Sequence, residues 1–203
     1  MNYTSCIVIA LLAAGCTSPS GTSSMPKPGK GIAEYREVTR LAQRAVANTV
    51  DSLEALRSGP HSSELARFDR TVEQLELTSI KARARADAII ARGQNYFDEW
   101  KEQLGTTNQP AAQANYNRLY DHFTRVRQRS SEVREEFRPF MAKLRHFRAQ
   151  LDRPANPPNS DSARTEIDAL KARGQRVLKT LEAVSTALND AENELHAMLA
   201  SKR

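Results

Sequence analysis

Histidine and acidic residues at helical spacing are the first candidates for chemistry, because together they can bind a metal ion. The chain has four histidines, at positions 61, 122, 146 and 196. Glu192 and His196 are four residues apart, so a helix would place both on one face. One such pair supplies too few ligands for a specific site, and a di-iron bundle would need two Glu-x-x-His pairs, which the sequence lacks. The sequence therefore predicts no metal site.

Other catalytic patterns are missing too. The sequence has no glycine-rich phosphate loop, no nucleophile elbow and no cluster of cysteines. The positions expected to be buried carry almost no carboxylate or histidine, so a buried acid–base pair has no obvious place. We therefore expect no catalytic residues and no cofactor, and predict that the protein is not an enzyme.

One cysteine occurs in a context typical of lipid attachment. The uncharged apolar run from Cys6 to Gly15 is too short to span a bilayer, which needs about 20 residues, but it fits the core of a secretory signal. It ends in Leu-Ala-Ala-Gly-Cys, residues 12–16, which resembles the lipobox of bacterial lipoproteins. The resemblance implies that residues 1–15 are a lipoprotein signal peptide and that Cys16 is lipidated, with palmitate among its acyl chains. An ordinary cleaved signal with a chance cysteine is the alternative.

Lipidation at Cys16 would determine the cellular compartment of the protein and whether it keeps any free cysteine. Cys6 would leave with the signal and Cys16 would become a thioether, so the mature protein would have no disulfide and would depend on packing alone. The acyl chains would anchor it permanently to a membrane. Thr17 follows the cysteine, where an aspartate would retain a lipoprotein at the inner membrane in enterobacteria-like sorting. We therefore expect the outer membrane, with the protein facing the periplasm.

Composition divides the remaining chain into a tether and a folded domain. Residues 16–31 are rich in Ser, Thr, Gly and Pro and contain little that could be buried, which predicts a flexible tether. Residues 32–203 form the predicted helical domain, with most of the proline and glycine gathered in three interruptions. These interruptions delimit four helices, at about 32–57, 62–104, 111–153 and 163–201.

The four stretches share one hydrophobic period. Apolar residues recur at alternating steps of three and four, the a/d pattern of helices that pack at shallow angles, and we call these positions the seam. In the last stretch they are Ile167, Leu170, Gly174, Val177, Leu181, Val184, Leu188, Ala191, Leu195 and Met198. The polar exceptions elsewhere include Ser79 and one serine of the third stretch, Ser130. No stretch alternates with period two, so we expect an all-α fold.

Helix and loop lengths predict the arrangement. The second and third stretches should each be roughly 65 Å long at about 1.5 Å per residue, and a short loop between them favours an antiparallel hairpin. The fourth is nearly as long and the first is much shorter. We therefore expect an elongated antiparallel helical bundle of three long helices plus a shorter first helix, with coiled-coil-like packing. Pro139 lies inside the third stretch and predicts a kink or a short break.

The aromatic residues around Trp100 carry a family resemblance. The stretch YFDEWKEQL, residues 96–104, and the stretch from Asn115 to Leu151 resemble an uncharacterised family of bacterial helical lipoproteins with an F-x-E-W element at a helix end. The resemblance covers most of the folded domain and implies a helical fold and an envelope location, but no mechanism. The chain departs from the family pattern after Leu151, where the resemblance implies an Asn-rich continuation. Because Tyr96 and Trp100 fall on the seam, we expect core packing there rather than a ligand pocket.

Positive charge is concentrated in the third stretch. The chain carries a net charge of +6, and basic residues outnumber acidic ones in 111–153. Arg127, Arg134 and Arg148 fall at e positions, where they can pair with acids of neighbouring helices. The candidate anion-binding residues are Arg125, Arg129, Arg138 and Arg145. Behind a lipobox the available polyanions are envelope polymers and lipid head groups rather than nucleic acid, which we do not expect as a partner.

Two functions fit these patterns. The first is a non-enzymatic cell-envelope lipoprotein that acts as a periplasmic helical scaffold or protein-interaction module, with an envelope protein or a second copy of the chain as its partner. The second is a binding module for an anionic envelope polymer or lipid through the basic third helix. Salt dependence separates them, because polyanion binding weakens steeply with ionic strength and an apolar contact does not.

Overall fold

The described part of the chain is entirely helical. The structure, a computed structural model, describes residues 28–59, 62–106, 109–151 and 160–200. These residues form no strand and contain four α-helices: α1 (Pro28–Ser58), α2 (Ser62–Gly105), α3 (Pro110–Leu151) and α4 (Asp161–Ala200). The predicted all-α helical bundle is therefore confirmed. The proposed lipidation site, Cys16, lies outside the described residues, as does His61.

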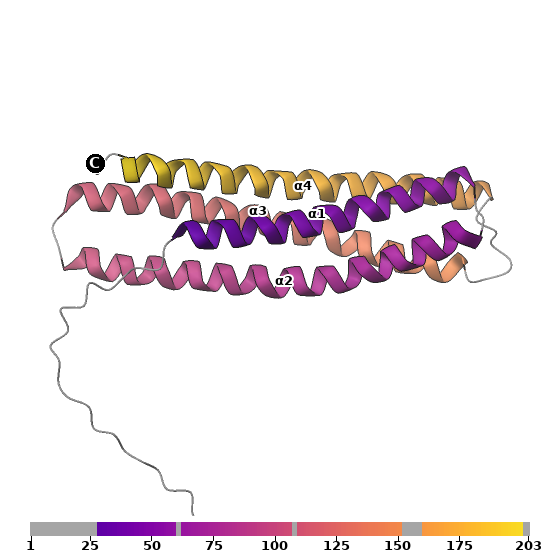
Figure 1. The fold of residues 1–203 in the computed structure, drawn as a ribbon, viewed down its shortest axis with the longest axis horizontal. Helices are drawn as coiled ribbons and strands as arrows, with labels where there is room; N and C mark the ends of the chain where they lie inside the picture. The colour runs from indigo at the N-terminus through magenta and orange to yellow at the C-terminus, as the bar shows by residue number, and fades with distance from the viewer. Residues whose placement is uncertain (1–27, 60–61, 107–108, 152–159, 201–203) are drawn as a thin grey trace, which may run out of the picture.

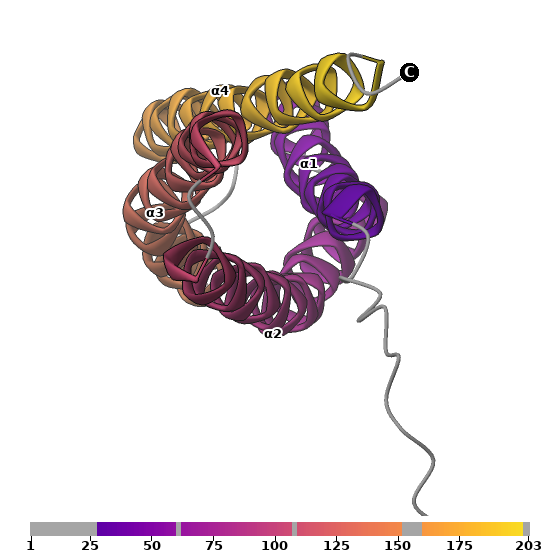
Figure 2. The ribbon, with the colours of Figure 1, turned by 90° about the vertical axis from the view of Figure 1, so that its left-hand side faces the viewer.

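The helices run alternately in opposite directions along one axis and form an elongated bundle (Figure 1). Each helix contacts its neighbour in the chain and α1 also contacts α4, which closes a ring when the bundle is viewed along its axis (Figure 2). The contact between α2 and α3 is the least extensive of the four. This ring leaves α1 facing α3, and α2 facing α4, across the bundle interior.

The first helix is shorter than the others and begins earlier than predicted. It starts at Pro28, so residues 28–31, expected in the tether, form its first turn. Gly29 lies beside Leu195 of α4, and Gly31 lies beside Ile89 of α2, so this turn is held by the bundle. Beyond the start of α1, the bundle continues with α2, α3 and α4 alone (Figure 1), which is the predicted partial three-helix cross-section.

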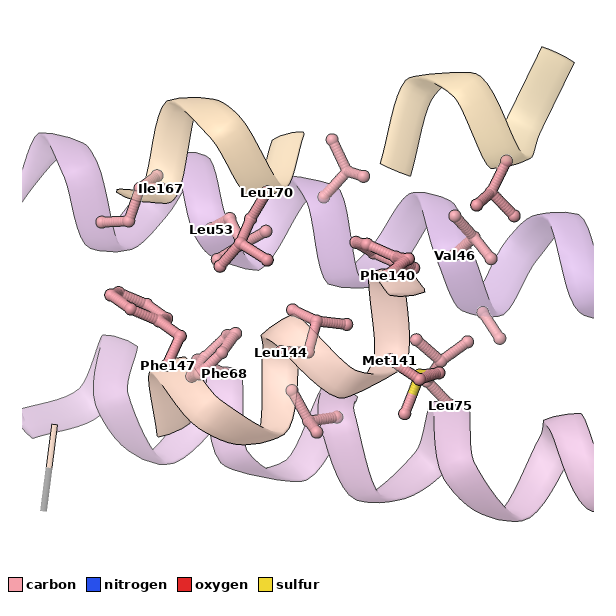
Figure 3. Packing of buried hydrophobic residues seen from close by; sticks show 14 of the residues in the cluster. Val46, Leu53, Phe68, Leu75, Phe140, Met141, Leu144, Phe147, Ile167 and Leu170 are labelled. Atoms are coloured by element: carbon pink, nitrogen blue, oxygen red, sulfur yellow. The ribbon is translucent and has the colours of Figure 1, made fainter. Parts of the chain in front are cut away.

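The largest hydrophobic core lies in the half of the bundle that contains the end of α1 and the start of α2. Its best buried side chains come from all four helices (Figure 3), and those with less than 2 % exposure are Phe68, Phe140, Phe147, Leu53, Leu56, Leu75, Leu144, Ile167, Leu170, Val46, Val72 and Val177. Every seam residue predicted for α4 is buried. Burial of this kind stabilises the fold by about 1.5–3 kcal/mol for each large apolar side chain.

Polar side chains buried within α1 are satisfied by hydrogen bonds. The Thr39 hydroxyl donates to the Tyr35 carbonyl at 2.9 Å, and the Thr49 hydroxyl donates to the Ala45 carbonyl at 2.9 Å. These bonds remove the cost of burying an unpaired hydroxyl, which is about 1–3 kcal/mol. Small hydroxyl residues can therefore occupy the interface of α1 with its neighbours, where the seam pattern alone predicts apolar ones.

The third helix continues through Pro139. It is unbroken from Pro110 to Leu151, so the predicted short break does not occur. Pro139 is exposed, and so is Glu135, whose carbonyl would have accepted the missing hydrogen bond. Because this carbonyl lies on the solvent side, water can satisfy it. The neighbouring Phe140 is fully buried and keeps the helix packed against the core.

Candidate functional site

Several arginines of α3 are paired with acidic residues of α2. Arg145 Nε lies 2.7 Å from Glu76 Oε1, and Arg134 pairs with Asp87. Arg148 Nη2 lies 2.8 Å from Glu73 Oε1. The predicted pairing of e-position arginines with neighbouring helices is confirmed for Arg134 and Arg148. These groups are partly exposed, so each pair adds at most about 1 kcal/mol, but together they fix how α3 lies against α2.

The four candidate anion-binding arginines divide into two groups. Arg129 pairs with Glu132 of its own helix at 2.8 Å. Arg125 is exposed, and its charge adds to the effect of partial burial in lowering the pKa of His122. Arg138 and Arg145, which are both exposed, instead lie at the rim of one cavity that is partly open to solvent. The structure therefore brings together two of the four candidates and leaves the other two further along α3.

The cavity that contains Arg138 and Arg145, which we call the mid-bundle cavity, has a volume of about 380 Å³. All four helices line it, with apolar residues such as Val38, Ala82 and Val184. Its charged lining residues are Arg83, Arg134, Arg138 and Arg145. No acidic side chain is among the described residues that line it, so this cavity combines an apolar wall with a cationic edge.

A second cavity, which we call the end cavity, lies next along the bundle axis. It has a volume of about 550 Å³ and is lined by Ile32, Ile90 and Leu188, among other apolar residues. Tyr35 lines both cavities, so the two adjoin. Volumes of 300–1,000 Å³ with mainly apolar walls and a few polar groups are typical of small-molecule sites.

The cavities arise from the middle of α2. Among its residues between Leu75 and Phe97, none is buried, although the seam pattern continues through them. Four of the six seam residues there are small, namely Ser79, Ala82, Ala86 and Gly93, and the other two are Ile89 and Tyr96. Small side chains cannot reach across the ring to fill its interior. The middle of the helix is still packed between the two cavities, because Ala86, Ile89 and Ile90 contact the buried Tyr35, Val126, Val184 and Leu188 and Gly93 lies against Phe123 of α3.

A buried hydrogen bond marks the place where the two cavities meet. The Tyr35 hydroxyl of α1 and the Ser130 hydroxyl of α3 lie 2.7 Å apart, and the Ser130 hydroxyl also donates to the Val126 carbonyl at 2.7 Å. Burial raises the pKa of Tyr35 above its ordinary value, so the phenol is neutral at physiological pH. Ser130, a polar exception in the seam, is thus the partner that allows Tyr35 to be buried.

The aromatic residues around Trp100 pack against each other at the three-helix end. Phe97 is the most buried of them on α2, and its ring centroid lies 5.9 Å from that of Tyr116 on α3. Trp100 lies 5.5 Å from Tyr116 in an edge-to-face arrangement. The rings pack against each other, as the seam predicts, but Tyr96 and Phe97 also line the end cavity, which the seam does not predict. The seam selects Tyr96 and Trp100 and misses the more buried Phe97.

The described residues offer no cluster of three or more His, Cys, Asp or Glu side chains that could hold a metal ion. Glu192, one half of the predicted candidate pair, accepts a hydrogen bond from Arg36 at 2.6 Å, which lowers the pKa of its carboxyl group. In the same parts of the chain, no helix is both long and apolar enough to cross a membrane.

Comparison with known proteins returns no match: no family model, no curated protein and no solved structure is similar to this chain. The resemblance to helical envelope lipoproteins therefore stays a prediction from the residues quoted for it. What the protein does must be argued from its own cavities, charges and exposed surfaces.

Proposed function

We propose that the protein is a lipid-anchored, non-catalytic helical module of the bacterial cell envelope, held at the outer membrane through Cys16 and facing the periplasm. In this proposal the bundle is an elongated spacer that presents one face to an envelope protein. The observation that carries it is the bundle itself: α2 has 44 residues, so the domain is about 66 Å long. A rod of that length can hold a partner away from the membrane surface.

The middle of α2 supplies the contact surface in this proposal. Leu77 is 55 % exposed and Ile80 is 66 % exposed, and the two lie one turn apart on the same helix. Two large apolar side chains exposed side by side form a small apolar surface that a partner can cover. We call this pair the α2 ridge. The family resemblance and the lipobox support the envelope location.

The arginine pairs also support a second candidate function, anion binding, but only for small ligands. A module that binds anionic polymers along α3 would need a row of free arginines, whereas those at 134, 145 and 148 are paired with acids of α2. The combination of Arg138 and Arg145 with an apolar cavity instead favours a small anionic lipid over a polymer. This second candidate is an anionic-lipid-binding module.

The anchor is tested by replacing Cys16 with serine and fractionating the cells. Serine has no thiol, so it cannot receive the diacylglycerol, and we expect the variant to lose labelled palmitate and to leave the membrane fraction. The parent chain should incorporate the label and stay with the membranes. A variant that is processed and anchored like the parent would show that the lipoprotein assignment is wrong.

The contact surface is tested in the same cells with a photoreactive residue at Leu77. A matched control carries it at Lys179, an exposed position on α4. We expect a discrete crosslinked product from position 77 and none from position 179. A product of twice the monomer mass identifies a second copy of the chain as the partner. Equal products from the two positions, or none from position 77, contradict the α2 ridge as the contact surface.

A further inference from the structure

We propose that the two cavities form one binding site for a single-chain fatty acid, with the carboxylate at Arg138 and the alkyl chain extending past Tyr35 into the end cavity. The inference rests on the second candidate function above, which it narrows to one ligand class and one place. It does not depend on the lipid anchor at Cys16.

The shape of the space favours one long chain. Lining residues on α3 run from Leu119 in the end cavity to Arg145 in the mid-bundle cavity. At about 1.5 Å per residue, the two cavities together extend along the axis for roughly 40 Å. An unbranched alkyl chain can lie along an apolar space of this length with its carboxylate at one end.

The charge at one end of this space favours an acidic head group. All charged residues that line the mid-bundle cavity within the described chain are arginines. Arg134 and Arg83 share Asp87, and Arg145 is paired with Glu76. Arg138, by contrast, has no acidic partner among the described residues. A guanidinium without a partner at the edge of an apolar cavity is suited to bind a carboxylate through two parallel hydrogen bonds.

The charges around the end cavity differ. Its charged lining residues are Lys30, Glu34, Arg92 and Glu99, of both signs, and Arg92 pairs with Glu34 across α1 and α2. Because positive and negative charges are balanced around the end cavity, it does not favour an anion. The difference between the two cavities sets the direction of the ligand, with the head group at the mid-bundle cavity and the chain end at the end cavity.

The way in is the middle of α2. Ile80 lines the mid-bundle cavity and is also 66 % exposed, so the cavity opens to solvent beside an apolar side chain. No side chain between Leu75 and Phe97 anchors α2 by full burial. Outward movement of this part of the helix would break the contacts of Ala86, Ile89 and Ile90 with the buried cluster of Tyr35, Val126, Val184 and Leu188, and would admit an alkyl chain from the side.

The test measures binding of palmitate by calorimetry to the delipidated full chain carrying Cys16→Ser, which removes the proposed acylation site. Ala82→Phe fills the mid-bundle cavity and should weaken palmitate binding about tenfold or more. The matched control is Ala84→Phe, an exposed position on the same helix that lines neither cavity, and it should bind like the parent. Circular dichroism checks that each variant is folded.

The head group is tested with a second pair of variants. Arg138→Gln should weaken palmitate binding about tenfold, because a charged hydrogen bond is lost. Arg125→Gln changes another exposed arginine of α3, one that lies outside both cavities, and should have no effect. Hexadecanol, which has the same chain without the charge, should bind the parent about tenfold more weakly than palmitate. Affinity should also fall about fourfold for each methylene removed from the fatty acid.

The outcomes distinguish binding in the cavity from binding on the charged surface of α3. If both arginine variants weaken binding equally and Ala82→Phe has no effect, the ligand lies on the surface of α3 and the cavity site is wrong, although anion binding survives. If palmitate does not bind at all, both the site and the second candidate function are wrong. If Ala82→Phe fails to fold, the arginine pair and the chain-length series still decide, because a flat response in both would overturn the proposal.

Discussion

Replacing Phe140 with alanine is expected to lower the free energy of unfolding by about 3–5 kcal/mol. Phe140 is fully buried on α3 and lies in the core between α1, α2 and α4 (Figure 3). Its ring also lies against Gly174 of α4, beside Val50 of α1. The loss combines the transfer of a large apolar side chain with the cost of a cavity. Urea unfolding followed by circular dichroism measures it.

Leu77→Ala is the control for this prediction. Leu77 is also a large apolar residue of a long helix, but it is 55 % exposed and belongs to the α2 ridge. Its removal should change the unfolding free energy by less than about 0.5 kcal/mol, as expected for a surface site. If Phe140→Ala and Leu77→Ala lowered the free energy of unfolding equally, the core would not lie on the face of α3 that carries Phe140.

Replacing Gly174 with leucine is expected to lower the free energy of unfolding by about 2–3 kcal/mol. A Cβ atom at this position would lie 2.5 Å from Val50 Cγ2 on α1 and 3.3 Å from the Phe140 ring. Valine is branched at Cβ and has little freedom to move away, so α1 and α4 would have to separate. Overpacking of this kind costs more than the helix propensity gained by removing a glycine, which is nearly 1 kcal/mol.

Gly105→Leu is the matched control, because a Cβ atom at Gly105 meets nothing within 4 Å. The two variants add the same side chain to a helical glycine, and thermal unfolding compares them directly. We expect Gly105→Leu to unfold at the parent temperature or slightly above it. A Gly174→Leu variant as stable as the parent would mean that α1 and α4 do not approach as closely as the structure shows.

The architecture could be predicted from sequence because it depends on a repeated pattern. In α4 the three–four spacing selects residues that are all buried, so the inward face of the helix follows from the period alone. In α1 the seam is less successful, because it includes Thr49 but omits Val46 and Val50, which are also buried. The buried face of α1 is therefore wider than a single three–four row of residues, and its hydroxyl groups are satisfied by the helix backbone.

The candidate site could be predicted only in part. Arg138 and Arg145 were selected for their charge, and the structure places both at the mid-bundle cavity. The cavity itself was missed, since Ala82, Ala86 and Gly93 were counted as core residues without regard to their volume. A drop in side-chain size along the α2 seam was the available signal. Which arginines stay unpaired depends on the register of α3 against α2, and single-helix periodicity does not determine this register.

Hydrogen exchange along α2 tests most directly whether its middle, which borders the two cavities, is less tightly packed than its ends. Isolated helices lose protection from their ends inward, whereas here both ends of α2 are packed and residues 76–96 contain no buried side chain. We predict that amides in 76–96 exchange faster than those in 66–75, and that palmitate slows the exchange of 76–96 selectively. Greatest protection in the middle of α2, with no change on adding palmitate, would contradict the account.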